Sequence, residues 1–283
     1  ETAARLIDDG ISFAAADNEG RTALMYAAGS GNVPMAEMLL EKGDDVDKTD
    51  VRGRTALAYA AKNGNAEIIR LIRDYGADIY LADKDGKQPV VYAIEQGNAE
   101  AFDLLTDGFM LFGSAVGRNG KTVLMYAIEG GNVQILRKVM DRGLTTLNKK
   151  DRFGRTALMY LVGEGRPDMV RELIQKGANV TARDNNGKTV LMYAAENGYV
   201  DGVRFLLEQG ADMWQAEADG RTVIGTAVKN AAKHPEVVAL LEERLKDINE
   251  PGYNGETLLM LYAGSGRDAD FARVAEKGGD IFK

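Results

Sequence analysis

A short segment that returns at a nearly constant interval constrains this chain more than any other feature. The segment Gly-Arg-Thr-Ala-Leu-Met-Tyr at residues 20–26 has close or looser copies along the whole sequence. The copies begin at Gly20, Gly53, Gly86, Gly120, Gly154, Gly187, Gly220 and Gly255, at separations of 33, 33, 34, 34, 33, 33 and 35 residues. A fixed period of this length is typical of a repeat architecture rather than of a globular domain with one central core.

One period, residues 20–52, predicts two short helices. Thr22 is suited to cap the first helix, and at helical spacing Leu24, Ala27 and Ala28 fall on one face. Glycines end that helix, and a second apolar stripe follows before Gly43, formed by Met35, Met38 and Leu39. A helix pair this small cannot bury both stripes alone, so neighbouring pairs must stack. The sequence therefore predicts an all-α fold, an α-solenoid of stacked helix-turn-helix units.

These residues resemble the ankyrin repeat family, whose unit is a β-turn and two antiparallel helices with a Thr-Pro-Leu-His-x-Ala signature. The signature reads Thr-Ala-Leu-Met-Tyr-Ala-Ala at residues 22–28, and the Gly-Ala-Asp that often follows the second helix occurs at 76–78 and 210–212. The resemblance covers essentially the whole chain. It implies β-turn or hairpin connectors and recognition of a protein partner through a concave groove and the turn tips. The family's histidine is mostly replaced by methionine, which we interpret as apolar filler.

The repeat boundaries predict a single solenoid over residues 1–283, although length alone would favour two domains. Residues 1–19 read as a partial N-terminal repeat, because residues 1–10 align with a second helix. Full repeats start near 20, 53, 86, 120, 154, 187, 220 and 255. The seventh repeat has a two-residue insertion within 229–234, and we expect its second helix to begin at Pro235 with His234 as a cap or loop residue.

Composition excludes several classes of function. The chain has 43 acidic and 35 basic side chains, a net charge of −8, and this argues against nucleic acid as a partner. The longest uncharged stretch, residues 22–36, is interrupted by Gly29, Gly31 and Pro34, so we expect no membrane insertion. With no cysteine and one histidine, we expect neither metal nor cofactor. We expect a monomer; the compartment stays open, with the cytoplasm slightly favoured over a secreted or periplasmic location.

Catalytic motifs are not apparent. His234 has no serine nearby in sequence, no Gly-x-Ser-x-Gly occurs, and each Gly-x-Gly lies between two predicted helices. The sequence therefore predicts a non-catalytic module that binds a protein or peptide, and a partner with acidic segments is one form of this prediction. Two alternatives stay open: a structural or scaffolding domain of a larger protein, and an enzyme with a carboxylate site in the groove.

A ladder of tyrosines is the first candidate binding surface. Each ring lies roughly 200° around its helix from the core leucine or valine, at about 100° per residue. The rings would either line the groove or pack between adjacent first helices, and both interpretations stand. The ladder consists of Tyr26, Tyr59, Tyr92, Tyr126, Tyr160 and Tyr193.

A ladder of cations directly before the helix caps is the second candidate. A cation at a helix N-terminus opposes the macrodipole, so its recurrence needs a cause. In six of the seven repeats an acid stands four residues before the cation, and local pairing with this acid is the favoured interpretation. The alternative is a basic surface of helix N-termini and cations that binds the carboxylates of an acidic peptide. Lys121 has Gly117 in place of that acid. The ladder consists of Arg21, Arg54, Lys87, Lys121, Arg155, Lys188 and Arg221.

A third candidate is the apolar run of residues 108–113, which contains Phe109 and Phe112. Buried packing is the favoured interpretation of this run, and an exposed binding tip is the alternative.

Overall fold

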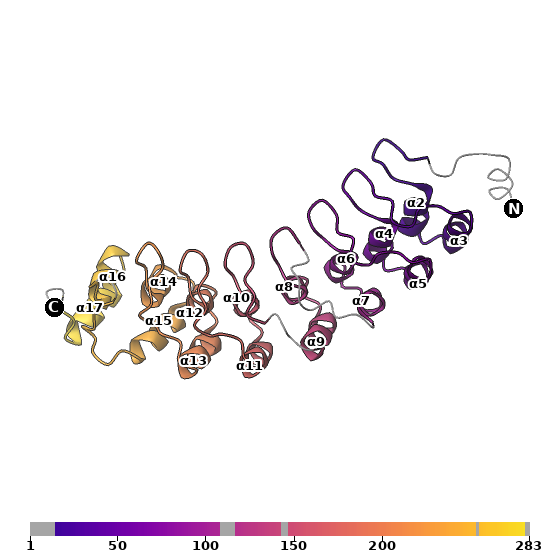
Figure 1. Ribbon diagram of the computed structural model, residues 1–283. Coiled ribbons are helices and arrows are strands. Elements are labelled where there is room, and N and C mark those ends of the chain that lie inside the picture. Colours follow the sequence, from indigo (N-terminus) through magenta and orange to yellow (C-terminus); the bar gives the residue numbers. More distant parts are fainter. Residues whose placement is uncertain (1–14, 108–116, 143–146, 253–254, 281–283) are drawn as a thin grey trace. The chain divides into compact units, whose positions relative to one another are not determined.

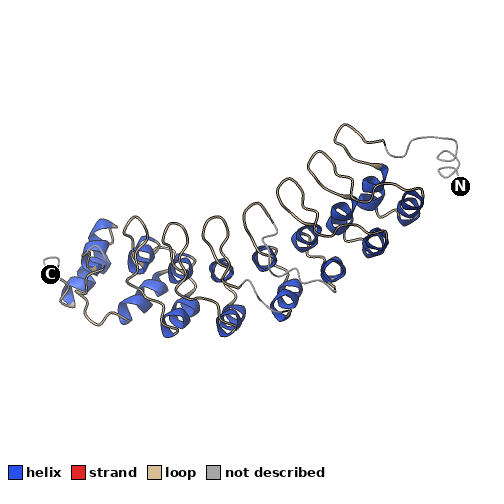
Figure 2. Ribbon diagram, in the orientation of Figure 1, coloured by secondary structure: helices blue, strands red, loops and turns tan. Residues whose placement is uncertain are grey.

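The computed structural model describes residues 15–107, 117–142, 147–252 and 255–280. Within these ranges the regular structure consists of helices, which are joined by loops and turns (Figure 2). This confirms the predicted all-α class. Each described helix is too short or too polar to cross a bilayer. The chain divides into two compact units, residues 1–146 and 147–283. The single continuous solenoid depends on the junction between these units and stays a prediction.

The first unit is two layers of helices built from consecutive helix pairs (Figure 1). The first helices of the pairs, α2, α4, α6 and α8, pack side by side, and the second helices, α3, α5, α7 and α9, pack in the same order behind them. The bounds are α2 Ala23–Ser30, α3 Val33–Glu41, α4 Ala56–Asn63, α5 Ala66–Asp74, α6 Pro89–Glu95, α7 Ala99–Thr106, α8 Val123–Glu129 and α9 Val133–Asp141.

The second unit repeats this arrangement. Helices α10, α12, α14 and α16 pack side by side, α11, α13 and α15 lie behind them, and α17 packs on α16. The bounds are α10 Ala157–Gly163, α11 Pro167–Gln175, α12 Val190–Glu196, α13 Val200–Glu208, α14 Val223–Lys229, α15 Pro235–Glu243, α16 Leu258–Gly264 and α17 Asp268–Glu276.

The core of each unit is the predicted stripe of the first helices. Leu24, Leu57, Leu124, Leu158 and Leu191 are at most 3% exposed. The small residues beside them, such as Ala60 and Ala61 in α4, are fully buried and allow the helices to approach closely. The stripe assignment from the sequence is therefore confirmed.

Threonine occupies the N-cap of each described first helix except α6, where Gln88 stands and makes no side-chain capping bond. Thr55, for example, is fully buried, and its hydroxyl accepts the backbone N–H of Ala58 at 3.2 Å. The methionine that follows has a role that the sequence did not show. The Sδ atom of Met125 accepts the backbone N–H of Thr122 at 3.5 Å, and Met192 does the same for Thr189 at 3.4 Å. The thioether, a weak acceptor, binds a buried donor, so the interpretation as mere filler is corrected.

An asparagine ladder distinguishes the first unit from the second. Asn32, Asn65, Asn98 and Asn132 cap the second helices of the first unit. The Nδ2 group of Asn132 also donates to the carbonyl of Gly97 in the preceding repeat at 2.8 Å. One side chain thus caps its own helix and binds the neighbouring pair. In the second unit this position holds Arg166, Tyr199, His234 and Arg267, none of which makes a side-chain capping bond.

The connectors between repeats are hydrogen-bonded turn loops, as predicted. In the loop of residues 50–54, the N–H of Asp50 donates to the carbonyl of Arg54 at 3.0 Å. Consecutive loops also bind one another: Val51 N–H donates to the carbonyl of Glu19, and Lys84 N–H to that of Arg52, both at 2.8 Å. The loops within a unit therefore form a stacked row (Figure 1).

The seventh repeat departs from the others where the sequence predicted. Helix α15 begins at Pro235, and His234 occupies its N-cap position. The imidazole makes no capping hydrogen bond but lies against Gly198, where a Cβ atom would come within 2.1 Å of Nδ1. The histidine therefore serves packing between the sixth and seventh repeats.

Candidate protein-interaction site

The tyrosine and cation ladders are parts of one motif, best seen in the second repeat. Asp50 Oδ1 accepts the backbone N–H groups of Arg52 and Arg54, each at 2.8 Å. Its Oδ2 accepts Arg54 Nε at 2.8 Å and the hydroxyl of Tyr59 at 2.9 Å. The Arg54 guanidinium also lies 4.8 Å from the centre of the Tyr59 ring. One carboxylate thus fixes the turn, the cation and the ring.

The same triad recurs in both units. Asp151 accepts Arg155 Nε at 2.9 Å and the Tyr160 hydroxyl at 2.7 Å. In the first repeat, Asp17 holds Arg21 and Tyr26 in the same way. The predicted local pairing with the acid four residues earlier is therefore confirmed where the cation of the motif is Arg21, Arg54 or Arg155.

The lysine repeats pair differently from the prediction. Lys87 Nζ lies 2.5 Å from Glu95 Oε1, and Lys188 pairs with Glu196, while Asp83 and Asp184 accept the tyrosine hydroxyls. Lys121, expected to lack the local acid, pairs with Glu129 at 2.6 Å. In the seventh repeat Arg221 pairs with Asp219 at 2.5 Å rather than with Glu217.

A sequence signal for the lysine pairs was overlooked. Where the cation is lysine, the residue eight positions later is glutamate; where it is arginine, that residue is glycine or lysine. The physical reason is that arginine can bind the turn aspartate and lie over the ring at once, whereas a lysine ammonium is a point charge without such a fork. It therefore takes its carboxylate from the end of the first helix.

Exposure differs along the tyrosine ladder. Tyr26 is 52% exposed, Tyr126 only 6%, and the other four rings are intermediate. Tyr126 is more buried than the other rings because residue 117 is glycine. A Cβ atom on Gly117 would lie 2.3 Å from the Tyr126 hydroxyl oxygen. Most rings are thus partly buried and keep some surface in solvent, and their place in a binding groove stays a prediction.

Ionisation follows the hydrogen bonds. Burial alone would raise the pKa of the Asp50 carboxyl, but the bonds from Arg54 and from the Tyr59 hydroxyl lower it below its usual value. The pKa of Asp151 is lowered by the matching bonds in its repeat. Burial and the bond to Asp50 raise the pKa of Tyr59 to about 12. At neutral pH these carboxylates are therefore ionised and the tyrosine is neutral.

These shifts predict the direction of acid unfolding. A carboxyl whose pKa is lower in the folded than in the unfolded chain stabilises the fold above its unfolded pKa, about 3.9, and this stability is lost as the pH falls through the folded pKa. Urea unfolding from pH 7 to pH 2.5 should therefore show a falling free energy of unfolding below about pH 4.

In the double variant Asp50→Asn/Asp151→Asn, the free energy of unfolding at pH 7 should fall by about 1–3 kcal/mol per site. Its dependence on pH should also become shallower. Asparagine keeps an oxygen for the turn N–H groups but brings an NH2 group to the tyrosine hydroxyl. An unchanged pH profile in this variant would contradict the assignment of the shifts to these carboxylates.

Phe109 and Phe112 lie outside the described residues, so their candidate tip stays a prediction. Among the described residues, no cluster of three or more His, Asp or Glu side chains is arranged to hold a metal ion.

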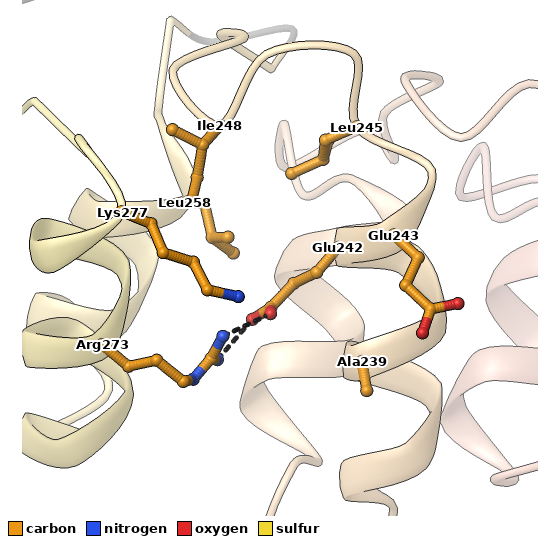
Figure 3. Close-up of a pocket in the computed structure, with 8 residues that line it drawn as sticks. All are labelled: Ala239, Glu242, Glu243, Leu245, Ile248, Leu258, Arg273 and Lys277. Carbon is orange, nitrogen blue, oxygen red and sulfur yellow. Dashed lines mark hydrogen bonds and ion pairs between the residues drawn. The ribbon is translucent and has the colours of Figure 1, made fainter.

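A hollow of about 320 Å³ lies between α15, α17 and the loop after α15 (Figure 3). The Arg273 guanidinium forms two bonds, 2.7 and 2.8 Å long, to the Glu242 carboxylate, which also accepts the Tyr262 hydroxyl. Lys277 and Glu243 line it as well, so its charges balance internally. We assign this cluster a structural role, because it ties the seventh repeat to the eighth.

Stacked pairs of short helices joined by turn loops define a helical repeat protein. A family model described as ankyrin repeats in three copies matches residues 1–83, 43–112, 75–151 and 142–217. The chain therefore belongs to the ankyrin repeat family. Domains of this family generally mediate protein–protein interaction.

Solved structures show the same fold. The ankyrin repeat domain of Bcl-3, described as a unique member of the IkappaB protein family, has a TM-score of 0.64 and 24% identity, covering 80% of this chain and 100% of that one. The human ASB11 ankyrin repeat domain has a TM-score of 0.67 and 21% identity, covering 80% and 99%. A search of curated proteins found no match. At these identities the likeness concerns the fold alone.

Proposed function

We propose that this chain is a non-catalytic protein-binding module that holds its partner in the groove of the first helices and at the turn tips. The observation that carries the proposal is the recurrence, in both units, of a partly exposed ring beside a cation. The proposed contact residues are Tyr26, Tyr59, Tyr92, Tyr126, Tyr160, Tyr193, Arg54, Lys87, Lys121, Arg155 and Lys188, with Phe109 and Phe112 as a further candidate tip.

The motif suits exchange of one carboxylate for another. Surface ion pairs are worth about 0–1 kcal/mol, so a partner's acid can replace the internal one at small cost. Lys87 and Glu95 are such a pair, with side chains 30% and 34% exposed. The partial exposure of this pair supports an acidic segment in the partner.

A carboxylate enzyme receives less support. General acid–base catalysis needs a carboxyl group that is free to exchange its proton with substrate. Asp50 and Asp151 instead have side chains with no exposed surface and already accept several hydrogen bonds, and their pKa values are lowered rather than raised.

Tyr59→Ala and Tyr160→Ala test the proposal, because both rings are partly exposed. With a partner isolated by affinity purification from the native source, isothermal titration should show a loss of more than about 1 kcal/mol for each variant. Tyr126 is unsuitable for this test, since its ring is buried and truncation would disturb the fold.

Glu37→Lys on the exposed surface of α3 is the matched control, and it should change the binding free energy by less than about 0.5 kcal/mol. Tyrosine variants that fold normally and bind like the wild-type chain would contradict the proposed surface.

A further inference from the structure

A hollow of about 370 Å³ lies between the first two repeats, on the first-helix face of the first unit. Its lining is mainly apolar and includes Met25, Tyr26, Gly29, Tyr59 and Lys62. Tyr26, which is 52% exposed, and Tyr59 both line it. The hollow thus offers two aromatic walls to one apolar side chain.

Gly29 opens this hollow. The same position holds Lys62, Glu95, Glu129, Glu196 and Lys229 in five other repeats, so the fold accepts a long side chain there. A Cβ atom on residue 29 would lie 3.6 Å from Tyr59 Cδ1, an ordinary contact distance. A larger residue at this position can therefore fill the hollow without straining the helix.

A second hollow, of about 610 Å³, adjoins the first and shares Lys62 with it. It lies between the second and third repeats and is lined by the cations Arg52, Arg54, Lys62, Lys84 and Lys87. Three acids also line it, Asp83, Asp85 and Glu95. The cations outnumber the acids, although the chain as a whole carries a net charge of −8.

The cations of this second hollow fall into two groups. Arg54 and Lys87 are engaged by Asp50 and Glu95. Arg52, Lys62 and Lys84 are exposed, and within the described part of the chain their side chains have no ion-pair partner. The side chains of the cation ladder that line this hollow are thus paired with acids of the chain itself. Arg52, Lys62 and Lys84 provide positive charge that is available to a partner.

The turn tips of the second unit differ in charge. The positions that correspond to Arg52 and Lys84 are filled there by uncharged or acidic residues, apart from Arg152, which lies over the Phe153 ring at 4.7 Å. The residues concerned are Phe153, Asn185, Asn186, Ala218 and Asp219. Exposed cations at the corresponding positions of the second unit are Arg152 and Lys229, whereas the three that line one hollow, Arg52, Lys62 and Lys84, lie in the first unit.

We propose that these two hollows form one peptide site for a linear acidic segment, in which one bulky apolar side chain enters between Tyr26 and Tyr59 and carboxylates lie on Arg52, Lys62 and Lys84. This inference rests on the proposed function and specifies its partner. Adjacent helices are about 8–10 Å apart and an extended chain advances about 3.3 Å per residue, so the anchor and the first acid are separated by about three residues.

A selection of random linear peptides on the whole chain tests the site. Display on phage should enrich peptides that carry one aromatic or large aliphatic residue with acids about three residues away. The enriched peptide, synthesised with a fluorescein label, is then titrated by fluorescence anisotropy. Gly29→Leu, which fills the first hollow, and Lys62→Glu, which reverses the shared charge, should each weaken binding by about tenfold or more.

Two matched controls separate local from general effects. Gly163→Leu makes the same change at the equivalent helix position of the second unit, where a Cβ atom would meet only Asn197 at 3.8 Å. Arg137→Glu reverses an exposed charge on α9. Both should bind within about twofold of the wild-type chain. Should Gly29→Leu fail to fold, Lys62→Glu carries the test, because that side chain is exposed.

The outcomes are distinguishable. Loss of binding in Gly29→Leu and Lys62→Glu alone supports the site. Wild-type affinity in both, with loss in Tyr160→Ala, keeps the protein-binding function and overturns the site. Enrichment of peptides without acids also overturns it. Enrichment of no peptide, together with no partner from affinity purification, contradicts the proposed function and this inference with it.

Discussion

Leu57→Ala and Leu191→Ala should each lower the free energy of unfolding by about 2–5 kcal/mol. Both side chains are fully buried in the stripe that each first helix presents to its neighbours. Truncation removes the burial of the leucine and leaves a cavity that rigid helices on both sides cannot close. Urea unfolding followed by circular dichroism measures the effect.

Val133→Ala is the control, because this valine is apolar but 47% exposed at the start of α9. The substitution should lower the free energy of unfolding by less than about 0.5 kcal/mol. Leu57 and Leu191 lie in different compact units. If the repeats form one cooperative solenoid, both variants shift a single transition; two transitions that respond separately would contradict the single-solenoid prediction. A loss below about 0.5 kcal/mol at Leu57 would show that the stripe is misassigned.

Gly86→Ala should lower the free energy of unfolding by about 3 kcal/mol, because it disturbs the row of stacked turn loops. Gly86 has a φ of 78°, and a Cβ atom there would lie 2.5 Å from the backbone nitrogen of Arg118. That nitrogen donates to the carbonyl of Asp85 at 2.8 Å, so the substitution strains residue 86 and also pushes the next loop away from its partner. The same melts measure the loss.

Gly43→Ala separates the two causes. Gly43 has a φ of 85° but would meet nothing within 4 Å, so alanine there should cost only the backbone strain, about 1–2 kcal/mol. Equal losses at positions 43 and 86 would show that contact between neighbouring turn loops adds nothing to stability.

Much of the candidate site followed from local sequence. The pairing of Arg54 with Asp50 was predictable because four residues of a tight turn bring the two side chains together whatever the rest of the chain does. The Lys121–Glu129 pair was missed because the two residues flank α8, and the glutamate eight residues after each ladder lysine is the sequence signal that could have found it. The burial of Tyr126 was missed as well, since it depends on the space that Gly117 leaves in the preceding turn loop.

The sequence by itself determined the repeat, its helices, their core stripes, and the family, because each is set by the period and by contacts within about 33 residues. Only the tertiary structure decided which charged surface side chains are paired with other residues of the chain and which are available to a partner. Lys87 pairs with Glu95 of its own repeat, whereas Lys62 lines the hollows on both sides of the second repeat and has no ion-pair partner among the described residues, which only the stack shows. The physical reason is that hollows and free charges arise between repeats, where side chains from different periods meet, and a pattern within one period does not encode that meeting.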